Sequence, residues 1–578
     1  MPLVIHIDPI PRIGMAAIVI WNQTYSLFGH GLAFSALIAA APIFTLLILL
    51  GIMKKAAWVA GLAGLAVTLV VAIAGYHMPP LLATSAAIYG AAFGLFPISW
   101  IIFWAIALFR LTVETGQFEV IRDSVGRLTP DPRLQALLIA FAFGAFLEGG
   151  AGFGTPVAIA ATMLTGLGFS AFSASAICLL ANTAPVAFGS IGIPVITLAG
   201  TTGLPLDKLS GAVGRICAPI SLIIPAYIIL ATGGFVSLSG IWLPALTCGA
   251  VFAGMQFLVS NYLGPQLTDI LAALSSLAAL IVYLRLWHPT TQESGPSIRN
   301  CLDQPVTLKV DEASAPEETS VLEPLSKNSL GKTLYAWMPY AFLVLCVLLW
   351  GVTPIQAKLN LISFSFPWPF LNDVVQRMPP IAATPTPYHA MFSMNLLSAA
   401  GTACMVATFL AAICLRVSPL RFARLLVSVT RQLLLPILTI SAVLAIGFLM
   451  NYCGATATLG LSFAASGAMF PFFSPLLGWL GVFLTGSDTA ANALFGNLQV
   501  VTAGRLGLDP VLMAAANSVG GVMGKMISLQ TIAIAAAATG LSVPDQSRLF
   551  RFTLKHSIFL ASLAGCLALV YTYVIHIR

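Results

Sequence analysis

The chain has 578 residues, of which 59% are hydrophobic and 8% are charged. Soluble domains carry about a quarter charged residues, so this composition excludes a water-soluble globule and predicts a protein embedded in lipid. The net charge of +7 does not indicate nucleic-acid binding, because the Lys and Arg residues stand at the ends of apolar stretches and form no continuous basic face. The nine cysteines are scattered without CxxC spacing, so neither a metal site nor a cofactor nor a disulfide framework is expected.

The N-terminal segment, residues 1–31, carries Asp8 and Pro9 where a secretory signal would need an uninterrupted apolar run. The first span is therefore expected to direct insertion, with translation starting at Met1 or Met15. Apolar stretches of roughly 20 residues, the length that a helix needs to cross the hydrocarbon core, follow along the chain. They predict an all-α polytopic membrane protein with about 12 to 14 transmembrane helices.

The spans fall into two membrane halves, residues 32–286 and 334–578, separated by a polar stretch at 287–333. That stretch is rich in Ser, Pro and acidic residues, which is typical of a flexible linker. Lys54 and Lys55 follow the first span and Arg clusters follow later ones, and such positive residues mark the cytoplasmic side of a membrane protein. The pattern predicts a cytoplasmic linker, with the N-terminus and the C-terminus both outside.

An internal repeat relates two parts of the chain, about 95–195 and about 434–530, by landmarks that occur in the same order. The corresponding pairs are Leu95-Phe96-Pro97-Ile98 with Leu434-Leu435-Pro436-Ile437, Gly116 with Gly454, Gly144 to Gly149 with Gly481 to Gly486, Asn182 with Asn517, and Gly189 with Gly524. By the charge argument the first copy opens with a span that runs toward the cytoplasm and the second with one that leaves it, so the copies are expected to be inverted. Two inverted repeats with interrupted helices are a recurring plan of secondary transporters, in which the interruptions meet at the substrate site.

Glycine and proline interrupt the apolar stretches at matching points of the two copies. The run from Glu148 to Pro156 is partnered by the run from Thr485 to Asn492, and a second pair begins at Asn182 and Asn517. Backbone groups freed by such breaks are tolerated in lipid only where they face protein, water or ligand. The pattern therefore predicts broken or re-entrant helices around a site near the middle of the bilayer.

Four charged residues lie in or beside apolar stretches, and three of them, Glu148, Asp488 and Lys525, lie on the interruptions. An ionisable group at the bilayer centre costs at least about 2.5 kcal/mol, so it is retained when it is paired or useful. We expect Lys525, together with Arg215, to hold a substrate carboxylate. Either acid is a candidate to carry a co-transported proton, because burial favours the protonated form of a carboxyl group. The polar residues expected to complete the substrate site are Asn182, Asn517, Thr155 and Ser487.

Other interpretations of these residues stay open at this point. Asp488 and Lys525 would form a buried ion pair that ties the second copy together without touching substrate. A membrane enzyme would use the same buried acids, although no metal, haem or flavin motif and no nucleophile with a matched base is visible. An ion channel usually needs a symmetric oligomer around one filter, whereas this chain contains two copies of its own.

Several strings in the sequence resemble the hallmark segments of the bacterial L-lactate permease family, which also includes glycolate permeases. They run from Gly144 to Ile159, from Asn182 to Gly189, from Gly478 to Thr489 and from Gly520 to Ser528, with Arg377-Met-Pro-Pro380 in a loop. The resemblance extends from Trp21 to the last span. The polar linker, Leu529 and Tyr25-Ser-Leu27 depart from the family pattern but leave the three charged residues of the interruptions unchanged.

The resemblance implies a multi-pass symporter of the bacterial inner membrane that moves L-lactate, glycolate and related 2-hydroxy monocarboxylates together with protons, and that is not an enzyme. The alternative is a permease for another small organic anion. A 2-hydroxy acid is ionised at neutral pH, much as Asp or Glu is. The negative cell interior opposes the entering anion by about 2.3 kcal/mol per 100 mV, and one proton moved with each anion cancels that penalty.

Overall fold

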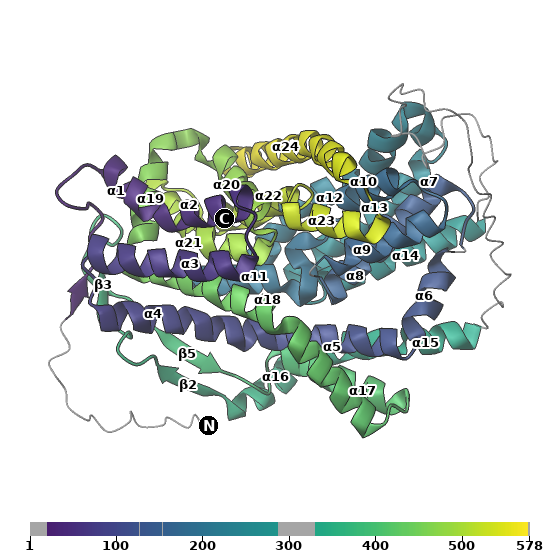
Figure 1. Cartoon of the computed structure of the whole chain (residues 1–578), viewed down its shortest axis with the longest axis horizontal. Coiled ribbons are helices and arrows are strands. Elements are labelled where there is room, and N and C mark those ends of the chain that lie inside the picture. The colour runs from purple at the N-terminus through teal and green to yellow at the C-terminus, as the bar shows by residue number, and fades with distance from the viewer. Residues whose placement is uncertain (1–19, 127, 153, 287–329, 576–578) are drawn as a thin grey trace.

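The computed structural model describes residues 20–575 apart from 127, 153 and 287–329. The two expected start positions, Met1 and Met15, and most of the polar linker predicted at 287–333 lie outside the described residues. The described chain is an assembly of helices with a small region of β-strands at one rim (Figure 1).

Fourteen α-helices precede the linker and ten follow it within the described residues. The first group is α1 (Leu32–Ala39), α2 (Ala41–Leu47), α3 (Ala57–Val70), α4 (Pro80–Phe93), α5 (Trp100–Glu114), α6 (Gln117–Gly126), α7 (Pro132–Gln135), α8 (Gly144–Gly150), α9 (Thr155–Gly166), α10 (Ala171–Ala181), α11 (Gly189–Thr202), α12 (Leu206–Ser239), α13 (Trp242–Tyr262) and α14 (Thr268–Leu286). The second group is α15 (Leu330–Gly351), α16 (Thr353–Leu359), α17 (Ala400–Cys414), α18 (Pro419–Cys453), α19 (Ala455–Phe463), α20 (Phe470–Thr485), α21 (Asp488–Leu506), α22 (Pro510–Lys525), α23 (Leu529–Thr539) and α24 (Val543–Tyr573).

Wider or tighter helical turns join some of these helices. The π-helical stretches are η1 (Ile48–Ile52), η2 (Val71–Gly75), η3 (Gly94–Ser99) and η4 (Ala136–Phe143), and the 3₁₀ turns are η5 (Val186–Phe188), η6 (Asn360–Ile362) and η7 (Ala464–Met469). Because η3 joins α4 to α5 and η4 joins α7 to α8, each forms one long apolar element with its neighbours.

The membrane-spanning character of the chain follows from the length and composition of these helices. In the described residues, 11 helical segments are long and apolar enough to cross a membrane, or up to 13 if each of two bent pairs counts as one span. One bent pair is α10 with residues 186–202, where the axis turns by 65°. The prediction of an all-α, multi-pass membrane protein with broken helices is confirmed.

The two repeat copies contain the same series of elements. In the first copy α5, α6, the α7–η4–α8 arm, α9, α10, α11 and α12 follow one another, and in the second copy the end of α18, α19, α20, α21, α22, α23 and α24 do so. Glycines with left-handed backbones stand at matching junctions: Gly116 and Gly454 after the first helix, and Gly203 and Gly540 before the last. A left-handed residue after a helix favours glycine because it lacks a Cβ.

Each copy contains two interruptions, which we name by their residues. The first tip (residues 151–154) joins α8 to α9, and the second tip (residues 486–487) joins α20 to α21. The first break (residues 182–192) follows α10 and includes the non-helical first turn of α11, and the second break (residues 526–528) separates α22 from α23.

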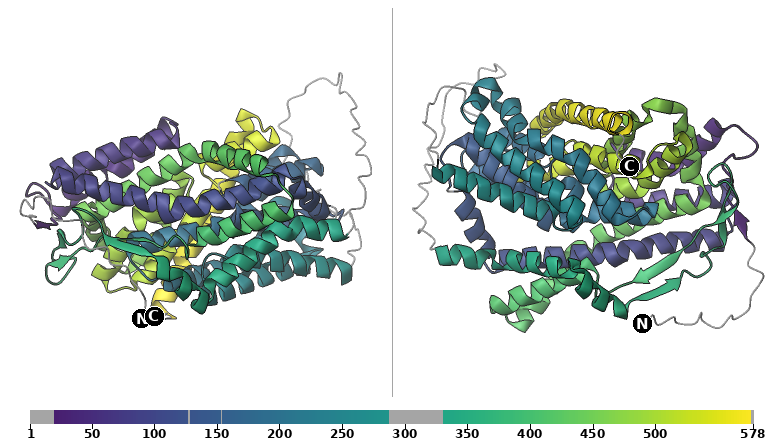
Figure 2. Two further views of the ribbon diagram at one scale, coloured as in Figure 1. Left: turned by 90° about the horizontal axis from the view of Figure 1, so that it is seen from below. Right: turned by 180° about the vertical axis from the view of Figure 1, so that it is seen from behind.

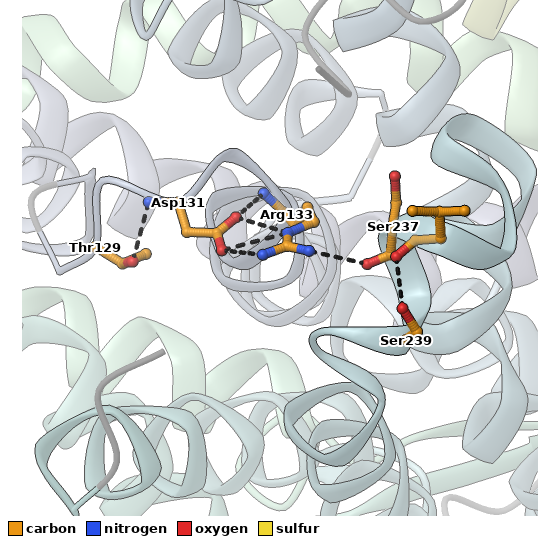
Figure 3. A network of polar contacts seen from close by, with 6 residues as sticks. Thr129, Asp131, Arg133, Ser237 and Ser239 are labelled. Atoms are coloured by element: carbon orange, nitrogen blue, oxygen red, sulfur yellow. Dashed lines mark hydrogen bonds and ion pairs between the residues drawn. The ribbon is translucent and has the colours of Figure 1, made fainter. Parts of the chain in front are cut away.

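Each tip joins the two arms of a helical hairpin, which are α7–η4–α8 and α9 in the first copy and α20 and α21 in the second. The two hairpins enter the protein from opposite ends of α12. At the base of the first hairpin, Arg133 binds Asp131 at 2.8 Å and donates from Nη1 to the carbonyl of Ser237, near the end of α12 (Figure 3). The base of the second hairpin is the turn between α21 and α22, where Asp509 shares a cavity with Asp207 at the start of α12. The copies are therefore inverted relative to each other, as the charge pattern predicted.

The copies also interlock with each other. The arm α9 of the first hairpin packs on α23 of the second copy, and the arm α21 of the second hairpin packs on α11 of the first copy (Figure 1). Asn492 in α21 donates from Nδ2 to the carbonyl of Pro194 in α11 at 3.1 Å, and Thr162 in α9 donates to the carbonyl of Ala538 in α23 at 3.4 Å. This exchange of arms brings all four interruptions to the interface between the copies.

Five short strands form the one region that the all-α prediction did not include. Strand β1 (Trp21–Asn22) pairs in parallel with β3 (Val375–Arg377), β3 pairs antiparallel with β4 (Thr386–Pro387), and β2 (Phe364–Pro367) pairs antiparallel with β5 (Met391–Met394). Figure 2 shows β2 and β5 at the rim of the helical body. Tyr89 of α4 anchors them, since its hydroxyl donates to the carbonyl of Met391 at 3.0 Å.

The two ends of α12 mark two faces of the molecule. The strand face comprises the start of α12 at Leu206 and residues 352–399, which contribute to one cavity wall. The arginine face comprises the end of α12 at Ser239 and the Arg133 contact.

Candidate functional site

A cavity of about 400 Å³ lies where the four interruptions of the two copies meet. From the first copy it is lined by Glu148, Gly154, Val186, Gly189, Ser190, Ile193 and Pro194, and from the second copy by Thr485, Gly486, Ser487, Asp488, Thr489, Lys525, Gln530, Thr531 and Ile534. Helices α3, α5 and α18 close the remaining side. A cavity of this volume suits a small molecule.

The cavity extends toward the arginine face. Ala57 and Trp58, at the start of α3, belong to its wall. The other end of α3 leads to the strand face, because the indole of Trp21, in β1, donates to the carbonyl of His77 at 3.2 Å.

Close approach at the first tip depends on glycine. Gly152 has a left-handed backbone, and a Cβ at this position would lie 1.8 Å from the hydroxyl oxygen of Ser190 in the first break. The sequence pattern of glycines at the tip therefore has a packing reason as well as a helix-breaking one.

The first break contains an unusual backbone. Ser190 and Ile191 have positive φ values of 48° and 61°, and Gly192 follows with 75°. A β-branched residue such as Ile191 rarely adopts this left-handed conformation, because its side chain crowds the backbone. Such strain is typical of functional sites. It occurs here at the start of α11, beside the cavity.

Lys525 presents a buried ammonium group to the cavity. It ends α22, is 8% exposed, and donates from Nζ to the carbonyl of Gly486 in the second tip at 2.9 Å. No ion pair within 4 Å joins it to any carboxylate of the described residues. The expected alternative of a direct Asp488–Lys525 ion pair is not observed, so the charge of Lys525 is left available to a ligand.

Asp488 is held by its own copy. It begins α21 directly after Ser487, whose hydroxyl caps that helix by accepting from the amide of Ala490 at 3.3 Å. Oδ2 of Asp488 accepts from the hydroxyl of Ser518 at 2.7 Å and from Nδ2 of Asn492 at 3.3 Å, while Oδ1 is buried without a partner. One carboxyl oxygen is thus fixed and the other is free to take a proton.

Glu148 is the corresponding acid of the first copy. It is 3% exposed, lies one turn before the first tip, and has a buried Oε2 without a hydrogen-bond partner. A Cβ at Gly189 would lie 2.9 Å from its Oε1, so the first break touches this carboxyl group. Lys525 is near enough to act electrostatically on both Glu148 and Asp488.

The two expected asparagines lie behind the acids and not in the cavity wall. Asn182 faces Glu148, and its Nδ2 is buried without a partner. Asn517 donates to Oδ1 of Asn492 at 3.0 Å and accepts from Nε2 of Gln499 at 3.0 Å, which uses its amide within the network around Asp488.

The remaining expected site residues lie in three different places. Ser487 lines the cavity at the second tip. Arg215 lines a separate cavity of about 350 Å³ on the strand face, where its Nε donates to Oδ1 of Asn261 at 3.0 Å. The backbone of Thr155 begins α9 beside the first tip, but its side chain lies outside the described part of the structure.

Sequence reasoning missed several polar residues of the site. Gln530 and Thr531 follow the second break and line the cavity, as do Ser190 in α11 and Gln432 in α18. The order of the repeat could have indicated Gln530 and Thr531, because they follow the Gly524–Ser528 landmark. Gln432 had no such signal, since it belongs to the part of α18 that precedes the repeat.

A further buried acid, Asp269, was also missed. It stands in the first turn of α14 and is 1% exposed. Its position at the end of an apolar stretch gives no sequence signal of burial. Among the described residues, no three His, Cys, Asp or Glu side chains are grouped so that they could hold a metal ion.

Comparison with known proteins identifies the family to which this chain belongs. The L-lactate permease family matches residues 35–575. The chain is 44% identical to an L-lactate permease of Bacillus subtilis (strain 168), over 93% of this chain and 96% of that protein. It is 42% identical to the glycolate permease GlcA and 40% identical to an L-lactate permease, both of Escherichia coli (strain K12), each over 96% of this chain and 99% of the relative.

Among solved structures, the YdaH transporter of Alcanivorax borkumensis aligns with 82% of this chain and 84% of its own. The identity is 14% and the TM-score 0.38, which is too low to support an argument about fold or function. The family match and the identities to full-length relatives are sufficient by themselves: this chain is a member of the L-lactate permease family, as its sequence motifs predicted.

Proposed function

We propose that the protein is a secondary transporter that carries L-lactate, glycolate and related 2-hydroxy monocarboxylates together with protons. The observation that carries this proposal is the placement of Lys525, a buried cation without a carboxylate partner within 4 Å. The cavity that it faces is lined by both tips, by the first break and by residues on either side of the second break. Relatives at 40–44% identity are named as lactate and glycolate permeases, which supports the substrate class.

Lys525 is proposed to bind the substrate carboxylate. An ammonium–carboxylate contact in a site shielded from water is a strong, charge-assisted hydrogen bond. The starts of α21 and α23 adjoin the cavity at the second tip and second break, and the positive ends of their helix dipoles favour an anion there. Arg215 is not assigned this role, because it lies in another cavity.

The cavity's charge balance favours coupling to protons. If Glu148 and Asp488 were both ionised, they and Lys525 would carry a net charge of −1, and a bound monocarboxylate would make it −2. Uncompensated charge in a low-dielectric site is costly. Protonation of one acid lowers that cost, so anion binding and proton binding support each other. Proton symport is the direct consequence of this linkage.

Hydroxyl and amide groups in the wall provide for the 2-hydroxyl group of the substrate. Ser487, Thr489 and Gln530 line the cavity from the same copy as Lys525. A site built to hydrogen-bond a substrate hydroxyl rejects analogues that lack it, because its own polar groups are then left unpaired. A permease for another small organic anion is the alternative, and competition by propionate, which lacks the hydroxyl group, separates the two.

We further propose the inner membrane of a bacterial cell as the location. The positive residues that predict the cytoplasmic side include Arg133, so the arginine face would be cytoplasmic. The strand face would then be outside, and the charge pattern predicts both termini on that side.

The test is uptake of labelled L-lactate by the purified protein in liposomes under imposed pH gradients, with the membrane potential held at zero. Accumulation that grows with an inward proton gradient, and that unlabelled glycolate inhibits more than propionate does, supports the proposal. Counterflow without any pH-driven accumulation would leave a lactate carrier but reject symport.

A further inference from the structure

Asp269 is a buried acid that the substrate cavity does not use. It is 1% exposed, and both carboxyl oxygens lack a hydrogen-bond partner. A carboxyl group buried without partners is costly, and inside a membrane protein such a residue is functional by default.

Asp269 packs directly against the segment that carries Glu148. A Cβ on Gly149 would lie 2.9 Å from the Cβ of Asp269 and 3.0 Å from Cγ1 of Ile270, so only a glycine allows α8 and α14 to approach this closely. Glu148 directly precedes Gly149 in α8 and lies near enough to interact electrostatically with Asp269.

A vestibule on the strand face reaches Leu267, two residues before Asp269. A cavity of about 610 Å³ there is lined by the turn between α13 and α14, including Leu267, and by exposed Asp207 at the start of α12. The turn reaches inward as far as the first break, because a Cβ on Gly192 would lie 2.7 Å from the backbone carbonyl of Pro265. Asp269 is therefore two residues from the vestibule wall and packs against the segment of Glu148, and the substrate cavity extends toward the opposite face.

From this placement, and resting on the proposed proton symport, we propose that Asp269 is a proton relay between the strand-face vestibule and Glu148. The Asp269 carboxylate takes a proton from a hydronium ion in the vestibule, which changes the charge of the Asp269–Glu148 pair from −2 to −1. Asp269 then gives this proton to the Glu148 carboxylate, and the charge of the pair stays at −1 during that transfer.

The relay is interrupted in the conformation described here. Neither Oε2 of Glu148 nor either oxygen of Asp269 has a hydrogen-bond partner, so no hydrogen bond joins Asp269 to Glu148. A bridging water or a movement of the first tip is needed for transfer. This interruption is physically necessary, since a continuous path to a cavity that extends toward the arginine face would leak protons.

Lys525 acts on Glu148 from the substrate cavity, and few other titratable groups act on the Asp269–Glu148 pair. Helix α14 packs on α8, α11, α13 and η4. Besides Glu148, these elements contribute Cys248, which is hydrogen-bonded to Ser276, and the exposed Tyr262. Cys217 of α12 also lies near Asp269. Asp269 is thus the carboxyl group placed to exchange protons with Glu148 from this side.

The experiment compares Asp269→Asn with the parent protein in liposomes, using two assays. We expect counterflow of labelled lactate at equal pH on both sides to continue near the parental rate, because exchange of the protonated carrier does not need the relay. Uptake driven by a pH gradient should fall by about tenfold or more. Asp269→Glu should restore it, and Asp207→Asn, the same change at the mouth of the vestibule, should have no effect.

Parental pH-driven uptake by Asp269→Asn would overturn the relay, and so would equal loss of counterflow and uptake in that variant. If the parent itself shows no pH-driven uptake, the proposed function fails first, and this is measured before any variant.

A second measurement needs no variant. A hydrophobic carbodiimide modifies protonated carboxyl groups, and mass spectrometry of the parent locates the modified residue. Modification of Asp269 that lactate does not prevent supports the relay, whereas an Asp269 that stays unmodified at acidic pH contradicts it.

Discussion

Replacing Lys525 by methionine removes the cavity's cation while keeping the length of the side chain. The single contact that the structure shows for Nζ is the 2.9 Å hydrogen bond to the carbonyl of Gly486, so no buried carboxylate loses a direct ion-pair partner. Loss of one partner from a buried, hydrogen-bonded charge pair costs about 2–5 kcal/mol. In Lys525→Met this cost would appear in the free energy of substrate binding. The affinity for lactate should therefore fall by about 30-fold or more.

The assay is binding of labelled lactate to the purified protein, with neutral lactamide as a competitor. In Lys525→Met the affinity for lactate should fall while that for lactamide changes little, because the amide does not need the cation. Lys525→Arg should retain part of the preference for the anion, and Lys358→Met, the same change at an exposed lysine, should bind as the parent does. Parental lactate affinity in Lys525→Met would refute the assignment of the carboxylate to Lys525.

The other predictions concern the acids, their packing and the base of the first hairpin. If Glu148 or Asp488 carries the proton, the corresponding variant, Glu148→Gln or Asp488→Asn, should still exchange lactate. It should lose the roughly tenfold accumulation of lactate that one pH unit drives in liposomes. Normal accumulation in both variants would reject both acids as the proton carrier. Gly521→Ala should impair transport, because its Cβ would lie 2.1 Å from Oδ1 of Asp488 and overpacking costs about 1–3 kcal/mol, whereas Gly504→Ala, with no atom within 4 Å, should transport normally. Arg133→Ala should lower the free energy of unfolding of the purified protein by about 1–2 kcal/mol, because it breaks the partly buried pair with Asp131. Arg122→Ala breaks an exposed pair and should leave the free energy of unfolding unchanged. Equal effects of the two changes would contradict this.

The membrane architecture could be predicted from the sequence because its signals are local and strong. Apolar stretches set the spans, and the order of glycine, proline and asparagine landmarks identified the repeat. The four interruptions then indicated the neighbourhood of Glu148, Asp488 and Lys525, and the structure brings these three residues to one cavity wall. Short strands such as β2 carry no comparable signal, since four residues in a Pro-rich loop have little periodicity.

The detailed roles could not be predicted because they depend on three-dimensional packing. Arg215 and Asp269 both lie beside apolar stretches, but one is in a strand-face cavity and the other is buried next to Glu148. Asn517 matches Asn182 in the repeat, yet it lies within an unbroken helix and bonds to Asn492 and Gln499. Which way such a side chain faces follows from the crossing of helices distant in sequence.

The central claim is that substrate binds where the four interruptions meet. For this test, Cys301, Cys414 and Cys566 are first changed to serine. One cysteine is then introduced either at Thr489, in the wall of the substrate cavity, or at Lys208, in the cavity of Arg215. The rate of modification by a small, membrane-impermeant thiol reagent is then measured with and without lactate. The account predicts that lactate slows modification of Thr489→Cys and not of Lys208→Cys. Protection of Lys208→Cys alone would place the substrate in the other cavity and contradict the account.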